Sequence, residues 1–257
     1  CPDRREPGHK QHDPQQNGRE PVYHTGRTHT GITLIIKKRP DPLRILFPRR
    51  CPLCDGLLGR QETCICRSCE DTSVPSFYPF PGGFAPFPYE GKYRESVKRF
   101  KYSGRAEYAE YFARAILEAG EDEIRRHEPD CLVPVPVHRL RYRERGYNQA
   151  EELAKELSKL LGIPCRSRLL IRIRNTVPQN PLLPEERREN VKNAFSLREA
   201  DIRKKSVPKR ILLVDDICTT GATLEAAASV LYRCGAAEIR AVCATAAHYT
   251  RQPGNSA

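Results

Sequence analysis

The segment Ile211–Thr223, "ILLVDDICTTGAT", joins a buried-strand pattern to a polar turn. Four apolar residues lead into Asp215 and Asp216, and a run of threonine, glycine and alanine follows. Ligands of open α/β sheets bind beyond the carboxyl ends of the strands, so we expect both carboxylates at such an end. We expect a helix from Ala222, whose N-terminal N–H groups and positive dipole end suit a phosphate.

A phosphorylated sugar fits this segment better than three competing interpretations. A Walker ATPase requires G-x-x-x-x-G-K-[ST], and the single Gly-Lys pair, Gly91-Lys92, is followed by Tyr93. A response-regulator receiver requires a lysine downstream, and Lys209 is the last lysine of the chain. A helix cap accounts for one aspartate or threonine, but not for two carboxylates with three threonines. The carboxylates can instead accept hydrogen bonds from ribose hydroxyls, while Gly221 lets the backbone approach a phosphate.

Strands and helices alternate on both sides of this segment, which predicts an α/β fold with a parallel sheet and flanking helices. Periodicity and stop signals predict helices over Glu107–Gly120, Asn148–Gly162 and Ala222–Cys234, and strands over Cys131–Val135, Ile211–Val214 and Glu238–Ala247.

Composition divides the chain into four parts. We expect a disordered basic extension (1–42), a four-cysteine module (43–75), an α/β domain (76–248) and a disordered tail (249–257). The prolines of Val74–Gly91 predict a linker. No stretch approaches the roughly 20 apolar residues that span a bilayer, so we expect no membrane insertion and a cytoplasmic protein.

Two C-x-x-C pairs predict a structural zinc site, with Cys51, Cys54, Cys66 and Cys69 as its ligands. An iron–sulfur cluster is the alternative, because four cysteines also suit iron. Cys64 makes a poorer pair with Cys66 and is not among the predicted ligands. Cys131, Cys234 and Cys243 stand in apolar segments and are expected in the core.

The chain carries a net charge of +12, which favours polyanionic partners, although a solvated basic surface is the simpler interpretation. Arg139, Arg141, Arg143 and Arg145 alternate along the chain, a density that suits pyrophosphate or a nucleic-acid backbone. Four aromatic residues lie near basic ones and could stack on bases: Phe100, Tyr102, Tyr142 and Tyr147.

Three motifs in order resemble a known family. "ILLVDDICTTGAT" resembles the phosphoribosyl pyrophosphate (PRPP) signature of type I phosphoribosyltransferases. "VPVPVHRLRYRERGYNQAEELA" (Val133–Ala154) and "TVPQNPLLPEERRENVKNAF" (Thr176–Phe195) resemble the ComF family of competence proteins in particular. The four-cysteine module fits the same family, and the resemblance spans roughly Cys51–Ala247.

The resemblance implies a type I phosphoribosyltransferase fold, with a parallel sheet, flanking helices and a flexible hood, preceded by a small zinc-binding module. It implies that Asp215 and Asp216 hold the ribose hydroxyls of PRPP. The segment around its 5-phosphate would be Cys218, Thr219, Thr220, Gly221, Ala222 and Thr223. The pyrophosphate loop beside Mg²⁺ would be Val135, Pro136, Val137, His138 and Arg139. The polar members of the hood would be Arg174, Gln179, Arg187, Arg188 and Asn190.

Three functions compete. The first is a ComF-type protein that binds PRPP with Mg²⁺ and single-stranded DNA and serves DNA uptake, with a competence helicase or other uptake proteins as partners. The second is an active phosphoribosyltransferase acting on an unidentified nitrogen nucleophile, for which no general base stands out in the sequence. The third is a recruiting protein whose PRPP site is a relic.

Overall fold

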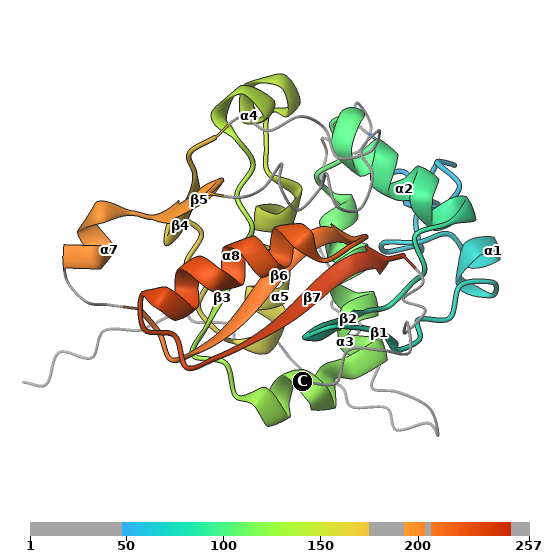
Figure 1. The fold of residues 1–257 in the computed structure, drawn as a ribbon. Helices are drawn as coiled ribbons and strands as arrows, with labels where there is room; N and C mark the ends of the chain where they lie inside the picture. The colour runs from blue at the N-terminus through green and yellow to red at the C-terminus, as the bar shows by residue number, and fades with distance from the viewer. Residues whose placement is uncertain (1–47, 175–192, 204–206, 248–257) are drawn as a thin grey trace, which may run out of the picture. The chain divides into compact units, whose positions relative to one another are not determined.

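The computed structural model describes residues 48–174, 193–203 and 207–247, all within one compact unit, Pro42–Ala257. Within these residues the main sheet has five strands in the order β1-β2-β7-β6-β3 (Figure 1). They are β1 (Tyr78–Phe80), β2 (Gly83–Ala85), β3 (Cys131–Pro134), β6 (Arg210–Cys218) and β7 (Glu238–Ala246). All neighbouring strands run parallel except β1 and β2, which form an antiparallel hairpin.

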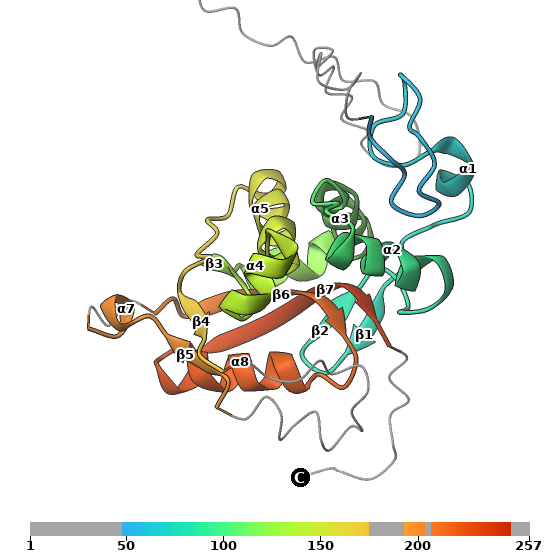
Figure 2. The ribbon, with the colours of Figure 1, turned by 90° about the horizontal axis from the view of Figure 1, so that it is seen from above.

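Helices cover both faces of this sheet, as Figure 2 shows. One face carries α2 (Gly91–Tyr102), α3 (Tyr108–His127) and α5 (Gln149–Leu161), and the other carries α8 (Ala222–Arg233). Successive residues of β6 divide between the two layers, because side chains alternate along a strand. Leu212 and Val214 belong to the core under α3 and α5, while Ile211 and Leu213 belong to the core under α8. The predicted α/β fold is confirmed.

Local signals place α5 where the sequence predicts it. The side chain of Asn148 accepts a hydrogen bond from the backbone N of Ala150 and so caps the start of the helix. Gly162 adopts the left-handed conformation (φ 72°) and ends it. The buried residues of this helix are Gln149, Ala150, Leu153, Ala154 and Leu157.

The segment predicted as a linker contributes strands to the sheet. β2 pairs with β7, and Gly83 lies opposite Ala241. A Cβ at Gly83 would lie 1.9 Å from the Ala241 carbonyl oxygen, so only glycine permits this approach. The proline in β1, Pro79, is tolerated because β1 is an edge strand.

The end of one helix, the end of one strand and the exposure of one cysteine differ from the sequence predictions. α3 continues past Gly120 through a kink to His127, because Ile124 and His127 beyond the kink are buried. β6 continues past Val214 to Cys218. Cys234 is exposed rather than in the core, because it is the C-cap residue of α8.

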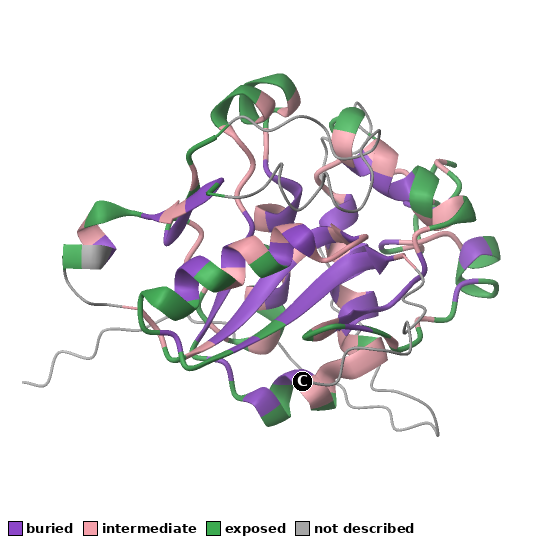
Figure 3. Ribbon diagram, in the orientation of Figure 1, coloured by how far each residue is buried: buried purple, intermediate pink, exposed green. Residues whose placement is uncertain are grey.

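Shorter elements complete the described chain: α1 (Arg67–Glu70), α4 (Arg139–Arg145), α7 (Glu199–Arg203) and the antiparallel pair β4 (Leu170–Arg172) and β5 (Phe195–Leu197). Figure 3 shows the central strands buried and α4 without a buried residue. Among the helices described, none has the length and apolar character that a bilayer crossing requires. The predicted extension (1–42) and tail (249–257) lie outside the described residues.

Candidate functional site

The aspartate pair lies beside the carboxyl end of β3. β3 ends at Pro134, opposite Val214, and the next backbone N, of Val135, donates to the Val214 carbonyl at 2.8 Å. Asp215 and Asp216 follow directly, but β6 itself runs on to Cys218. The prediction that both acids end their own strand is therefore wrong. They stand at the end of β3 because β6 is the longer strand.

The two carboxyl groups differ in their electrostatic surroundings. Burial raises the pKa of Asp215 to about 8, and the neighbouring Asp216 charge contributes to the rise. The backbone N of Asp216, which donates to Asp215 Oδ1 at 2.8 Å, opposes this rise, as do Lys101 and Arg172. Asp215 therefore titrates near neutral pH, whereas an exposed aspartate would be ionised throughout that range.

Asp216 is held by a lysine that sequence patterns do not reveal. Lys101 Nζ, at the end of α2, lies 3.0 Å from Asp216 Oδ2, and the two side chains are only 20% and 12% exposed. No local pattern marks Lys101, because its partner is remote in sequence and the helix is rich in other basic residues.

Two arginines from different elements also lie close to the acids. Burial lowers the pKa of Arg172 to about 10, with Arg141 contributing and Asp215 opposing. Burial likewise lowers the pKa of Arg141, with Arg145 adding to the effect and Asp216 among the groups that oppose it. Two guanidinium groups that repel one another beside carboxylates form a place where an anion with several charges is stabilised.

The turn after β6 contains the residues predicted to surround the 5-phosphate. Thr219–Gly221 separates the strand from α8, and Gly221 takes the left-handed conformation (φ 76°) as the N-cap residue. Thr219, Thr220 and Thr223 are partly buried, and Thr220 Oγ1 accepts from the Ala222 N at 3.5 Å. The side chains of Cys218 and Ala222 lie in the core, so these two can offer only backbone groups.

The predicted pyrophosphate loop leads from β3 into α4. Val135 is buried, Pro136, Val137 and His138 are partly buried, and Arg139 is exposed. His138 Nδ1 accepts from the Leu140 N at 3.4 Å and caps α4.

The arginines beyond this loop lie on a helix, so the alternation seen in the sequence does not put them on one side. Arg141 and Arg145 share one side of α4 and Arg139 and Arg143 another, because residues four apart align on a helix.

The described part of the predicted hood is its base. β4 and β5 pair with Arg172 opposite Phe195, and the Arg172 guanidinium lies 5.2 Å from the Phe195 ring centre. Arg174 is exposed at the end of this part. The other predicted members, Gln179, Arg187, Arg188 and Asn190, lie outside the described residues.

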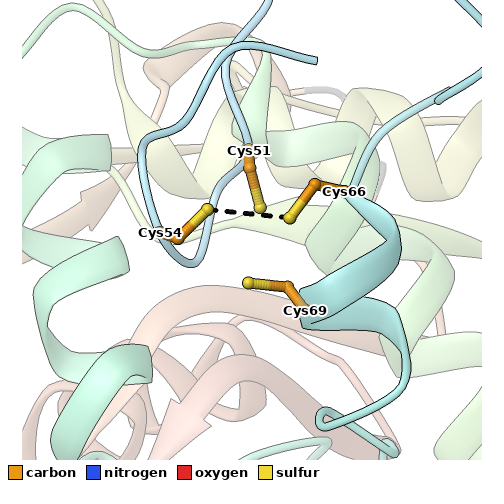
Figure 4. Close-up of side chains that lie close together, drawn as sticks. All are labelled: Cys51, Cys54, Cys66 and Cys69. Carbon is orange, nitrogen blue, oxygen red and sulfur yellow. Dashed lines mark hydrogen bonds between the residues drawn. The ribbon is translucent and has the colours of Figure 1, made fainter. Parts of the chain in front are cut away.

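The four predicted metal ligands come together. The sulfur atoms of Cys51, Cys54, Cys66 and Cys69 all lie within 4.8 Å of one another, and Figure 4 shows the side chains pointing toward a common centre. Cys54 Sγ and Cys66 Sγ are 3.7 Å apart, close to the roughly 3.8 Å edge of a tetrahedron with Zn–S bonds of about 2.3 Å. The residues fit a structural zinc ion. Cys64 is not part of this cluster, as its poorer spacing predicts.

The four-cysteine segment is bonded to α2 and α3. Arg99 Nη2 donates to the carbonyl oxygens of Pro52 and Leu53, both at 2.9 Å, in the loop between the first two cysteines. Tyr108 donates from its hydroxyl to Asp55 Oδ1 at 2.9 Å. These contacts fix the first cysteine loop against the α/β domain.

Two of the four aromatic residues considered for base stacking are exposed. Tyr102 is 71% exposed and Tyr142 is 48% exposed. Phe100 is fully buried, so its expected stacking role is wrong. Tyr147 is partly buried and donates from its hydroxyl to the Phe100 carbonyl. Arg145 lies over the Tyr102 ring, 4.9 Å from its centre.

The chain is similar in sequence to a known domain family and to several known proteins. The phosphoribosyl transferase domain family matches residues 144–255. Competence protein F of Haemophilus influenzae is 37% identical over 148 residues, which cover 56% of this chain and 63% of that protein. The DNA utilization protein YhgH of Escherichia coli is 33% identical over 150 residues, which cover 57% of this chain and 64% of that protein. The chain thus spans somewhat less than two thirds of the length of these two relatives. Competence protein ComFC of Bacillus subtilis is 30% identical over 192 residues, 73% of each chain.

Proposed function

Because the chain belongs to the ComF family of competence proteins, we propose that it binds PRPP with Mg²⁺ and single-stranded DNA, and that it serves DNA uptake. The observation that carries the PRPP part is the convergence of the acid pair, the Thr219–Gly221 turn and the two arginines at one edge of the sheet. A competence helicase or other DNA-uptake proteins are the proposed partners. A cytoplasmic location goes with the proposal, because PRPP is a cytoplasmic metabolite.

In this proposal each chemical group of PRPP meets a matching part of the site. The ribose hydroxyls donate to the carboxylates of Asp215 and Asp216. The 5-phosphate lies at the N-terminus of α8, where backbone N–H groups and the helix dipole favour an anion. The pyrophosphate lies toward Arg141 and Arg172, whose positive charges act more strongly because they are partly buried. Mg²⁺ prefers oxygen ligands, which the carboxylates and the pyrophosphate both offer.

The second part of the proposal places single-stranded DNA on the surface that carries Tyr102 and Tyr142. Exposed aromatic rings beside arginines are the combination that binds single strands, through stacking on bases and attraction to phosphates. Arg145, stacked on Tyr102, supplies such a charge.

A salt titration of single-strand affinity tests this part. We expect Tyr102→Ala and Tyr142→Ala each to weaken binding by about 1–3 kcal/mol. Tyr232→Ala is the matched control, because Tyr232 is 47% exposed but lies on α8, on the other face of the sheet. Affinity should fall steeply with salt, since each phosphate contact adds about −0.7 to the slope for a single strand. Equal losses in all three variants would contradict this placement.

One observation favours an active transferase as a second candidate. Burial raises the pKa of Asp215 to about 8, so in its ionised form this carboxylate is a stronger base toward an incoming nucleophile than an exposed aspartate. Mg²⁺-dependent release of pyrophosphate from PRPP across a panel of nucleobases and amines tests it. Release with one acceptor that disappears in Asp215→Asn at PRPP concentrations that saturate the variant would support the transferase, and binding without turnover would favour the binding protein.

A further inference from the structure

The last turn of α2 lies between the four-cysteine segment and the acid pair. Arg99 and Lys101 are two residues apart, and positions two apart point to opposite sides of a helix, about 200° around its axis. One side reaches the first cysteine loop and the other reaches Asp216.

The first contact fixes the helix end to the cysteine loop. The guanidinium of Arg99 donates to two consecutive carbonyl oxygens, of Pro52 and Leu53, at 2.9 Å each. These residues lie between Cys51 and Cys54, so their carbonyl directions depend on how the loop is folded around the sulfur cluster. Arg99 therefore responds to the shape of that loop.

Phe100, between the two basic residues, prevents the turn from slipping. Its side chain is fully buried, and its carbonyl oxygen accepts from the Tyr147 hydroxyl and from Gln149 Nε2, the latter at 3.3 Å. Rigid packing of this kind transmits a displacement rather than absorbing it.

The second contact determines the charge next to the proposed ribose site. Lys101 Nζ and Asp216 Oδ2 are 3.0 Å apart, and both side chains are largely shielded from water. The Coulomb attraction within a shielded pair exceeds that within a surface ion pair, because less water screens the two charges. Without Lys101, Asp216 would lose its ion-pair partner, and its charge would repel an anionic ligand more strongly.

We propose that Lys101 is a positioning residue for the acid pair, and that Arg99 makes its placement depend on the folded four-cysteine loop. The inference rests on the proposed function, because it concerns how the same acid pair is held ready for PRPP. It assigns the cysteine module a role in the ligand site in addition to its own folding.

Two measurements on the full-length protein test the inference, one of which needs no PRPP. The first measures the rate at which each lysine is acetylated by a limiting amount of reagent, with mass spectrometry as the readout. A slow rate at Lys101 indicates that its amine is held in the ion pair with Asp216. Lys98 is the internal control, because it is on the same helix with its side chain 43% exposed and pairs with Glu95 at the surface. We expect Lys101 to react about tenfold more slowly than Lys98, consistent with a shielded, charge-assisted hydrogen bond.

Variants test separately the Lys101–Asp216 contact, the Arg99 contact and the folded cysteine loop. Asp216→Asn and Arg99→Met should both bring the Lys101 rate close to that of Lys98, as should removal of metal with a chelator. Arg99→Lys keeps one donor and should give an intermediate rate, which guards against a general loss of fold in Arg99→Met. An unchanged Lys101 rate in Arg99→Met and in the chelated protein would overturn the inference.

Calorimetry with PRPP and Mg²⁺ supplies the second measurement. Lys101→Met should weaken binding about tenfold, Lys101→Arg should restore most of it, and Lys98→Met should leave it unchanged. In an Asp216→Asn background Lys101→Met should add little. Tighter binding by Lys101→Met would overturn the inference. If the native protein binds no PRPP but the acetylation rates are as expected, the proposed function is wrong. The inference that Arg99 and the cysteine loop position Lys101 is then still supported.

Discussion

The side-chain amide of Asn148 joins the start of α5 to the loop beside the acid pair. Its Nδ2 donates to the Val135 carbonyl at 3.0 Å, and its Oδ1 accepts from the Ala150 N at 3.2 Å. Asn148 is only 6% exposed, so both bonds are sheltered from water. One residue therefore both begins a helix and fixes the first residue of the predicted pyrophosphate loop.

Substitution of Asn148 should separate these two tasks. Asn148→Ser keeps a helix cap and loses the bond to Val135, whereas Asn148→Ala loses both. We expect the serine variant to lower the free energy of unfolding by about 1–2 kcal/mol and the alanine variant by about 1 kcal/mol more. Denaturant unfolding measures this. A serine variant as stable as the native protein would show that the bond to Val135 contributes nothing.

The kink of α3 depends on glycine. A Cβ at Gly120 would lie 2.5 Å from Cζ of the buried Phe84 ring, so Gly120→Ala forces the ring or the helix to move. We expect a loss of about 1–3 kcal/mol in unfolding free energy. In a Phe84→Leu background the added cost should shrink, because the smaller side chain leaves room. An equal cost in both backgrounds would place the strain elsewhere.

The four-cysteine cluster should hold one zinc ion per chain. Cys54→Ser and Cys66→Ser should lose the metal and lower the melting temperature, because a module this small depends on its metal for stability. Cys234→Ser is the matched control, as Cys234 is exposed and outside the cluster.

Elemental analysis of the purified protein measures the metal content of each variant. Loss of zinc in Cys64→Ala, with Cys54→Ser unaffected, would contradict the assigned ligands. A visible absorption band with bound iron would favour the iron–sulfur alternative.

Asp215 should make the stability of the protein depend on pH. Its pKa is about 8 in the folded protein, against an ordinary value of 3.8, so the folded state binds this proton more tightly than the unfolded chain does. The stabilisation that this proton gives to the folded state is complete below the pKa of Asp215 in the unfolded chain. It is lost as the pH rises through about 8. Unfolding free energy should therefore fall between about pH 4 and pH 8, and Asp215→Asn should flatten this part of the profile. The same slope in the variant would assign the effect to another group.

The sequence predicts those features that depend on local patterns. The apolar strand at Ile211–Val214, the ends of α5 and the two C-x-x-C pairs each lie within a short stretch, and the structure confirms them. The acid pair and the turn before α8 are adjacent in sequence, so their proximity follows directly.

Features that depend on tertiary packing cannot be predicted from local sequence patterns. Gly120 predicts a helix stop, but burial of Ile124 and His127 outweighs the low helix propensity of glycine. The proline-rich segment gains strands because β7 offers an unpaired edge to β2. Lys101 meets Asp216 only because the chain between them folds into α3, β3 and α5.

The acid pair is tested most directly by calorimetry of PRPP with Mg²⁺ against the native protein and the double variant Asp215→Asn, Asp216→Asn. We predict one binding site in the native protein and a loss of affinity of at least about 100-fold in the variant, because both acids that accept hydrogen bonds from the ribose hydroxyls are replaced. Equal affinity in the two proteins, with the variant folded, would contradict the central claim that this acid pair holds the ribose.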